Sequence, residues 1–256
     1  MIITDHNINA LNILAPVSRV VSLVPSLTET IASLGGGENL AGVTRFCKYP
    51  EEIRLKTAVV GGPKDFDTEK IMRLHPDVVV AVKEENDKSR IMHLAGKIPV
   101  VLFDIVHLED VWDMIRTLGR LLGKEKEAGR MTAAIRHGFK TLPETGLRPK
   151  CAYLIWKKPW MAAGKETFIN AMLQLAGFEN VVEGRYPEIG EAAFAQAEVL
   201  LLSSEPFPFG EKDAAELQRR YPQKKILPVN GEMFSWYGAR MLHASRYFQQ
   251  LRQRTQ

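Results

Sequence analysis

Short, almost continuous apolar runs alternate with amphipathic stretches in the first half of the chain. The runs occupy residues 20–24, 40–44, 58–61, 77–82 and 99–105. Stretches with helical periodicity occupy residues 26–34, 68–74, 87–97 and 108–122, and Ser26 with Glu29 predicts a capping box for the first of them. Strands that are apolar at every position are typical of a parallel sheet covered by helices on both faces. The first half therefore predicts an α/β lobe.

The second half repeats the pattern after a segment of different character. Residues 124–142 are rich in Ala, Glu, Lys and Arg, predict one long helix, and precede the breaker PETGLRP. Further strands are predicted at residues 151–156, 199–203 and 225–229, and further helices at residues 167–176, 211–221 and 239–252. We therefore expect an α/β protein with two Rossmann-like lobes that contain parallel sheets, residues 1–123 and 144–256, joined by a backbone helix at residues 124–143.

The composition is that of an ordinary globular protein. Of the 256 residues, 45% are hydrophobic and 25% are charged, which excludes disordered and collagen-like classes. The formal net charge of +4 comes without a long basic run, so the sequence predicts no nucleic-acid partner. No apolar stretch approaches the roughly 18 residues that a membrane span needs.

The cysteines do not settle the cellular compartment, and the N-terminus says more about it. The two cysteines, Cys47 and Cys151, lie far apart and form no CxxC motif, so they indicate neither a zinc site nor a disulfide framework. Residues 1–15 do not have the basic start and apolar core of a secretion signal. We expect a periplasmic or cell-surface location if a signal has been removed, and a cytoplasmic one if Met1 is the native start.

The loops that follow the predicted strands combine aromatic with basic residues. Ligands of open α/β sheets bind outside the carboxyl ends of the strands, and this mixture suits a flat ligand with anionic edges. The alternative is that each ring packs the end of its lobe. The residues that we expect to contact a ligand are Arg45, Phe46, Cys47, Tyr49, Lys64, Phe66, Lys83, Glu84, Asn86, Trp160, Lys165, Glu232, Phe234, Trp236 and Tyr237.

Motifs for catalysis or for a bare metal ion are missing. The sequence has no G-x-S-x-G elbow and no P-loop, and its six histidines form no H-x-x-x-H pair. Among them we keep His107 as a cleft candidate, because it follows the end of a strand. Cys47 is either a soft metal ligand or a small packed residue. We therefore predict no catalytic residue and no protein-held metal.

The segment at residues 20–35, VVSLVPSLTETIASLG, resembles the start of the class III solute-binding proteins of ABC importers for ferric siderophores, heme and cobalamin. The similarity continues through DTEKI at residues 67–71 and LHPDVVVA at residues 74–81. In the second half, GKET at residues 164–167 and GFENV at residues 177–181 are similar to the cobalamin-binding member. The resemblance implies a monomer with two lobes, a backbone helix, and a ligand bound between the lobes.

The resemblance also implies roles for particular residues. Glu69 and Glu191 match the two carboxylates through which the family docks on the importer permease, although an acidic residue in the first turn of a helix is favoured in any protein. Phe46 matches an aromatic contact, and Phe234 and Trp236 fall in the C-terminal binding loop. Pro63 stands where the cobalamin-binding member has Trp. This chain lacks the His-rich set of the zinc and manganese binders.

These observations lead to one hypothesis with two alternatives. The chain is predicted to capture a metal chelate or corrinoid (ferric siderophore, heme or cobalamin) for an ABC importer, with the metal complex as cargo and no resident cofactor. Basic loop residues favour an anionic chelate, and whole cobalamin stays open. One alternative is a cytoplasmic binding or sensor protein of the same fold. The other is an enzyme acting on the chelate, for which Glu84, Glu85 and Glu232 would supply carboxylates.

Overall fold

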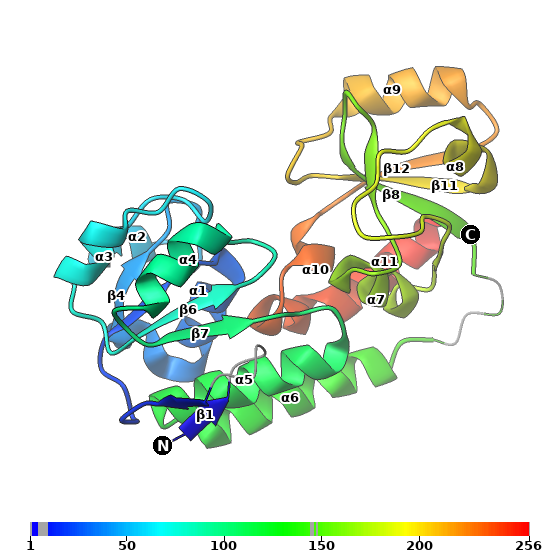
Figure 1. Ribbon diagram of the computed structural model, residues 1–256. Coiled ribbons are helices and arrows are strands. Elements are labelled where there is room, and N and C mark those ends of the chain that lie inside the picture. The colour runs from blue at the N-terminus through cyan, green and yellow to red at the C-terminus, as the bar shows by residue number, and fades with distance from the viewer. Residues whose placement is uncertain (1, 5–9, 144–145, 147, 256) are drawn as a thin grey trace. The chain divides into compact units, whose positions relative to one another are not determined.

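Figure 1 shows a computed structural model of the protein, which describes residues 2–4, 10–143, 146 and 148–255. The chain divides into two compact units. The first unit holds Met1–Ile135 and Tyr237–Leu242, and the second holds Arg136–Trp236 and His243–Gln256. One boundary thus falls inside helix α6 (Glu125–Lys140), where the sequence predicts a long helix. The predicted domain limits at residues 123/124 and 143/144 stay predictions.

The first unit is built on a five-stranded parallel sheet in the order β5-β4-β3-β6-β7. Its strands are β3 (Val20–Ser22), β4 (Leu40–Val43), β5 (Ala58–Val59), β6 (Val78–Val82) and β7 (Val100–Phe103). All five residues of β6 are buried, as its unbroken apolar sequence predicts. A separate antiparallel hairpin of β1 (Ile2–Thr4) and β2 (Ala10–Asn12) escapes the sequence prediction, because strands of three residues carry no periodic signal.

Helices cover both faces of this sheet (Figure 1). They are α1 (Pro25–Ile31), α2 (Ile53–Lys56), α3 (Thr68–Arg73), α4 (Lys88–Ala95) and α5 (Leu108–Leu122). On one face, α3 and α4 contribute Ile71, Ile91 and Leu94 to a core with residues of β3 and β6. On the other face, α1 and α5 both pack against the 3-10 turn η3 (Gly238–Arg240). That turn belongs to the first unit although it comes late in the chain.

The start of α1 corrects the predicted capping box. The helix begins at Pro25 with Val24 as its N-cap, so Ser26 lies inside the first turn instead of before it. Proline is favoured at the first helical position because its φ is already helical and it has no N–H to satisfy. The hydroxyl of Ser26 is buried and has no hydrogen-bond partner among the described residues.

The second unit has a parallel sheet in the order β10-β8-β11-β12, with β9 antiparallel to β8. Its strands are β8 (Lys150–Trp156), β9 (Met161–Ala163), β10 (Glu179–Asn180), β11 (Val199–Ser203) and β12 (Lys225–Val229). The sequence predicts β8, β11 and β12 but not β9 and β10, which are too short to show a pattern. The two sheets confirm the predicted α/β class.

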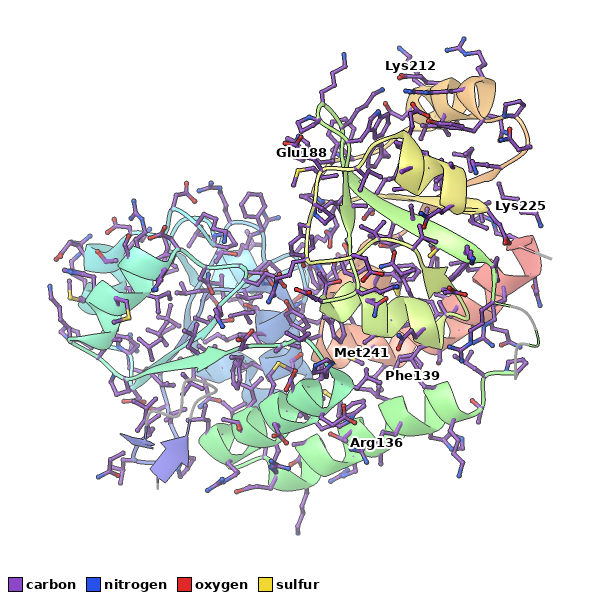
Figure 2. All side chains as sticks on the ribbon, turned by 45° about the vertical axis from the view of Figure 1, so that its right-hand side comes forward. Arg136, Phe139, Glu188, Lys212, Lys225 and Met241 are labelled. Atoms are coloured by element: carbon purple, nitrogen blue, oxygen red, sulfur yellow. The ribbon has the colours of Figure 1, made fainter. Side chains whose placement is uncertain are left out.

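The helices of the second unit also lie on both sides of its sheet (Figure 1). They are α7 (Phe168–Leu175), α8 (Glu191–Gln196), α9 (Glu211–Arg220), α10 (Glu232–Ser235) and most of α11 (Met241–Thr255). Phe194 of α8 and Leu217 of α9 join one core with β8 and β11. In the second unit's part of α6, Phe139 stacks on Phe248 of α11 with ring centroids 6.2 Å apart (Figure 2). No helix in the described ranges combines the length and apolar character that a membrane crossing requires.

Candidate functional site

In each unit the chain adds strands first on one side of its starting strand and then on the other, so the strand order reverses at one pair of neighbouring strands. In the first unit it runs from β3 to β4 and β5, then crosses to β6 and β7 on the other side. In the second unit it runs from β8 to β10 on one side and then to β11 and β12 on the other. Ligands of parallel α/β sheets bind outside the carboxyl ends of the strands at such a point. The candidate positions are therefore the ends of β3 and β6, and the ends of β8 and β11.

The loop after β4 carries an exposed ring and a paired cation. Phe46 is 55% exposed, and the guanidinium of Arg45 lies 5.0 Å from its ring centroid. Arg45 Nη2 also lies 2.8 Å from Asp65 Oδ2, and this hydrogen bond holds the pKa of the Asp65 carboxyl below its ordinary value. Of the predicted residues in this loop, Phe46 offers the largest apolar surface to a ligand.

Cys47 lies in the interior of the first unit. Its thiol is fully buried, with Sγ 3.1 Å from Thr28 Oγ1 and 3.2 Å from Thr44 Oγ1. Burial raises the pKa of this thiol, so the thiolate that a soft metal prefers is disfavoured. The geometry is that of a packed residue, and a ligand contact through Cys47 stays a prediction.

Tyr49 lies beside a buried ion pair. The guanidinium of Arg240 is 3.9 Å from the Tyr49 ring centroid, and its Nη2 is 2.7 Å from Glu29 Oε1. The side chains of Arg240 and Glu29 are 10% and 12% exposed. Tyr237, in the same late segment of the first unit, is buried as well. This segment is thus attached to α1 by an ion pair and to the loop after β4 by a ring contact.

The predicted residues after β5 and β6 make contacts within the first unit. Lys64 Nζ donates to the backbone carbonyl of Glu84 at 2.8 Å, and Lys83 Nζ lies 2.5 Å from Asp104 Oδ2. Phe66 is fully buried in the core.

Asn86 joins three loops of the first unit through its side-chain amide. Asn86 Oδ1 accepts from the backbone N–H of Val82, and Asn86 Nδ2 donates to the carbonyls of Leu23 and Pro63. The ends of β3 and β6 are therefore tied together at the reversal point, and the role of Asn86 in the structure is to position these loops.

In the second unit, two of the predicted aromatic residues are packed. The Trp160 ring stacks on Phe209 with centroids 5.9 Å apart and meets Phe194 edge-on at 6.0 Å. Phe234 is fully buried, 5.1 Å from the Tyr153 ring and 4.9 Å from that of Phe248. These rings form the core around the sheet, which is the alternative that the sequence left open.

The loop after β12 is held by a carboxylate from the loop after β11. Glu205 Oε1 accepts hydrogen bonds from the indole N–H of Trp236 at 2.9 Å and from the Ser235 hydroxyl at 2.6 Å. Trp236 is 8% exposed and Glu232 is also buried. Lys165, after β9, is exposed and lies 2.5 Å from Glu183 Oε1. Glu205 therefore sets the position of Trp236, and nothing in the sequence pattern points to it.

The two predicted docking carboxylates have different surroundings. Glu69, in the first turn of α3, is exposed and makes no ion pair or hydrogen bond within the described part of the chain. Glu191, the first residue of α8, forms an ion pair with Arg220 and accepts a hydrogen bond from the Tyr221 hydroxyl. Glu69 is thus available to a partner, whereas Glu191 would have to exchange Arg220 for one.

His107, the histidine that the sequence leaves as a cleft candidate, lies at the start of α5. His107 is exposed and lies at the N-cap of α5, where its backbone N–H donates to Asp110 Oδ2 at 2.7 Å. In the described ranges, no group of three or more His, Cys, Asp or Glu side chains is placed to hold a metal ion.

The sequence prediction missed one exposed ring at the reversal point of the second unit. Trp156 ends β8 and is 42% exposed, next to Phe207 of the loop after β11. As the last residue of an apolar run, it belongs to the predicted strand at residues 151–156 and not to a predicted loop. The sequence feature that points to Trp156 as a site residue is its position directly before the loop.

A profile of the periplasmic binding protein family matches residues 20–202. The match starts at the first residue of β3 and extends into β11. The chain belongs to this family. This membership confirms the resemblance to the class III solute-binding proteins of ABC importers.

Several known proteins are similar to this chain in sequence or in structure. A vitamin B12-binding protein of Pectobacterium carotovorum is 26% identical over 241 residues, which cover 89% of this chain and 86% of the relative. A solved structure described as a possible iron-binding periplasmic solute-binding protein of Staphylococcus epidermidis has a TM-score of 0.76 at 20% identity, covering 93% of this chain and 98% of that one. A periplasmic heme-binding protein of Vibrio cholerae has a TM-score of 0.74 at 18% identity, covering 91% and 98%. The two structures support the fold alone.

Proposed function

We propose that this chain is a solute-binding protein that captures a metal chelate or corrinoid (ferric siderophore, heme or cobalamin) and delivers it to an ABC importer. The observation that carries the proposal is membership of the periplasmic binding protein family across residues 20–202. The nearly full-length alignment with a vitamin B12-binding protein supports the ligand class. In this proposal the metal complex is cargo, the protein holds no resident cofactor, and no reaction is catalysed.

Within this ligand class, the ion pairs favour a complex of low net charge. Arg45 is paired with Asp65, Lys83 with Asp104, and Lys165 with Glu183, each inside its own unit. A strongly anionic chelate would have to compete with these carboxylates for their cations, which costs part of the attraction. The number of basic loop residues by itself favours an anionic chelate, but the ion pairs weaken that preference. Among the candidate ligands we therefore propose corrinoids first.

Intrinsic tryptophan fluorescence tests the proposal directly. The purified protein is titrated with cyanocobalamin, dicyanocobinamide, hemin and a set of ferric siderophores. We expect saturable quenching by one of these compounds at micromolar concentration or below. Flat titrations with all of them would reject the metal-chelate proposal. Light scattering of the same sample should give the mass of one 28.8 kDa chain, since we propose a monomer.

The importer permease is the proposed protein partner, with Glu69 as a docking carboxylate. Exposure and lack of an internal partner leave Glu69 ready for an arginine of a permease. Glu69→Ala should lower the stimulation of the importer's ATPase while the dissociation constant for the ligand stays unchanged. Glu109→Ala is the matched control, because Glu109 is also an exposed acid in the first turn of a helix. Equal stimulation by the Glu69→Ala and control variants would remove Glu69 from the interface.

This role places the protein on the outer face of the cytoplasmic membrane. The family name and its relatives support that location, and expression from the native gene followed by cell fractionation tests it. Recovery in the periplasmic or lipid-anchored fraction is expected. Recovery in the cytoplasm together with ligand binding would favour the sensor alternative.

A further inference from the structure

We propose that the end of helix α6 and helix α11 present a basic surface that binds a bilayer of anionic phospholipids. The term basic surface is used below for four side chains of the second unit, Lys140, Arg148, Arg246 and Arg254. The inference rests on the proposed function for its location, since a protein at the outer face of a membrane meets lipid headgroups. It adds a partner to the solute and the permease.

The first observation is that the charge of these segments has one sign. Helix α11 contains three arginines and neither Asp nor Glu. The part of α6 in the second unit contains Lys140 and no acid either. Arg148 lies between α6 and β8, where the sequence has one acid, Glu144, outside the described residues. By contrast, α9 of the same unit carries three acids beside its three bases. A surface of one sign attracts partners of the opposite charge.

The second observation is that these cations have no carboxylate of their own. All four members of the basic surface are exposed, and none makes an ion pair or a hydrogen bond within the described part of the chain. In the same unit, Lys165 lies beside Glu183, and Arg220 lies beside Glu191. The basic surface therefore gives up no internal partner when an anionic surface approaches it.

The third observation is that α6 and α11 pack directly on each other. Phe139 stacks on Phe248, and a Cβ added at Gly138 would lie 2.8 Å from Ser245 Oγ. The axes of helices in contact are about 10 Å apart. The potential of a charged surface also extends about 10 Å at 0.1 M salt, so cations on both helices can interact with one bilayer.

Arg252 holds the segment before Arg148 close to α11. Its guanidinium donates hydrogen bonds to the carbonyls of Leu175 and Ala176 at the end of α7 and to that of Pro143. Burial, and then the positive charge of Arg148, lower the pKa of Arg252, which places Arg148 near this helix. Because Arg252 satisfies three carbonyls, its role is structural and it is left unchanged in the test.

The apolar side chains of the two helices favour a lipid surface over a protein partner. Of the large hydrophobic side chains that the described residues leave exposed, Leu242 is the only one in α6 or α11, and it belongs to the first unit. Interfaces between proteins usually have an apolar core. The basic surface has none, so it fits adsorption on charged headgroups without insertion into the bilayer.

Sedimentation with lipid vesicles measures this binding. One set of vesicles contains phosphatidylcholine alone, and the other contains about one-third phosphatidylglycerol, which is anionic. We expect the unmodified protein to bind the anionic vesicles at low salt and to bind the neutral ones weakly. High salt should release the protein from the anionic vesicles, because it screens the attraction between charges.

The decisive variant removes two charges from α11. Arg246→Gln with Arg254→Gln should weaken partitioning onto anionic vesicles roughly tenfold or more, since each basic side chain near such a surface contributes about fivefold. Adding Lys140→Gln and Arg148→Gln should weaken it further by a similar factor. Circular dichroism shows that each variant is folded.

A matched control removes two charges from another helix of the same unit. Lys212 and Arg219 of α9 are exposed and make no ion pair within the described residues. Lys212→Gln with Arg219→Gln therefore lowers the net charge as much as the α11 double variant does. We expect this control to bind anionic vesicles nearly as the unmodified protein does, because its cations lie among acids.

The outcomes decide the basic surface separately from the proposed function. Weaker binding by the α11 variant than by the control supports it. Equal losses in both variants, equal binding to neutral vesicles, or no binding to vesicles by the unmodified protein overturns it. Tighter binding of poly-glutamate or of a DNA duplex than of anionic vesicles also overturns it, in favour of an acidic macromolecule. The fluorescence titration of the same α11 variant should give the unmodified dissociation constant for the solute. A failure of all solutes to bind rejects the proposed function and leaves the vesicle result to decide the basic surface.

Discussion

Both units contain a parallel sheet, but different kinds of side chain surround the ends of their strands. In the first unit, rings lie against cations, with Arg45 over Phe46 and Arg240 over Tyr49. In the second unit, rings lie mainly against rings, from Tyr221 and Phe194 through Trp160, Phe209 and Phe207 to Trp156. The exposed ring of the first unit, Phe46, therefore has a cation beside it, whereas the exposed ring of the second unit, Trp156, has another ring beside it. The comparison indicates that contacts with cations hold the strand-end rings of the first unit, whereas contacts with other rings hold most of those of the second.

The largest effect is expected from the buried ion pair of the first unit. Arg240→Met leaves the Glu29 carboxylate buried without its cation, so we expect the free energy of unfolding to fall by about 3 kcal/mol. Urea denaturation followed by circular dichroism measures this loss. Adding Glu29→Leu should recover most of it, since an apolar pair replaces an ionic one. A single variant as stable as the unmodified protein would show that the anchoring is not ionic.

The next largest loss of stability is expected where two backbone segments of the second unit pack closely at Gly164. A Cβ at Gly164, after β9, would collide with the carbonyl oxygens of Gly184 and Glu183, and backbone atoms cannot rotate away. Gly164→Ala should therefore lower the free energy of unfolding by about 2 kcal/mol. Gly190→Ala is the control, because no atom lies within 4 Å of the Cβ that it would add. Equal melting temperatures for the two variants would contradict the close packing of this turn.

A smaller, pH-dependent effect is expected at the ion pair of Lys157 and Asp213 in the second unit. The backbone N–H of Gly210 and then the Lys157 ammonium hold the pKa of Asp213 below its ordinary value. An Asp with a lowered folded pKa stabilises the native state above its ordinary pKa near 4, and this contribution disappears as the pH falls through the folded value. Asp213→Asn should thus cost about 1 kcal/mol at pH 7 and progressively less on acidification. A stability difference that stays constant from pH 7 to pH 3 argues against this origin.

The smallest effect is expected from an exposed pair. The side chains of Lys165 and Glu183 are 45% and 76% exposed, so solvent screens their attraction. Lys165→Met should change the free energy of unfolding by no more than about 0.5 kcal/mol. Thermal melts at low and high salt measure it. A loss comparable to that of Arg240→Met would contradict the expected difference between the buried ion pair of the first unit and this exposed pair of the second.

The main elements of both sheets were predictable because each carries its own local signal. β11 and β12 have the predicted bounds, and α5 has the predicted helical range with its strongly amphipathic sequence. The hairpin of β1 and β2, and strands β9 and β10, were not predictable. Strands of two or three residues gain their hydrogen bonds from partners elsewhere in the chain, so the pattern within them is too short to read.

The candidate site was predictable as a set of loops but not residue by residue. Phe46 and Phe66 both follow strands of the first unit, yet one is 55% exposed and the other is fully buried. Trp160 and Trp156 flank the same turn, yet the sequence singled out the packed ring and passed over the exposed one. Loop position predicts that a residue lies near the strand ends, and packing against distant segments decides whether its side chain reaches a ligand.

The sequence by itself determined the alternation of strands and helices, the parallel sheets and the family, because these depend on patterns within about ten or fifteen neighbouring residues. Only the tertiary structure decided which charges are available. Lys157 meets Asp213 across 56 positions, and Arg240 meets Glu29 across 211. Such pairs form because folding brings distant segments together, and burial then strengthens their attraction by removing water. A count of basic residues in loops therefore overstates the charge that a ligand meets.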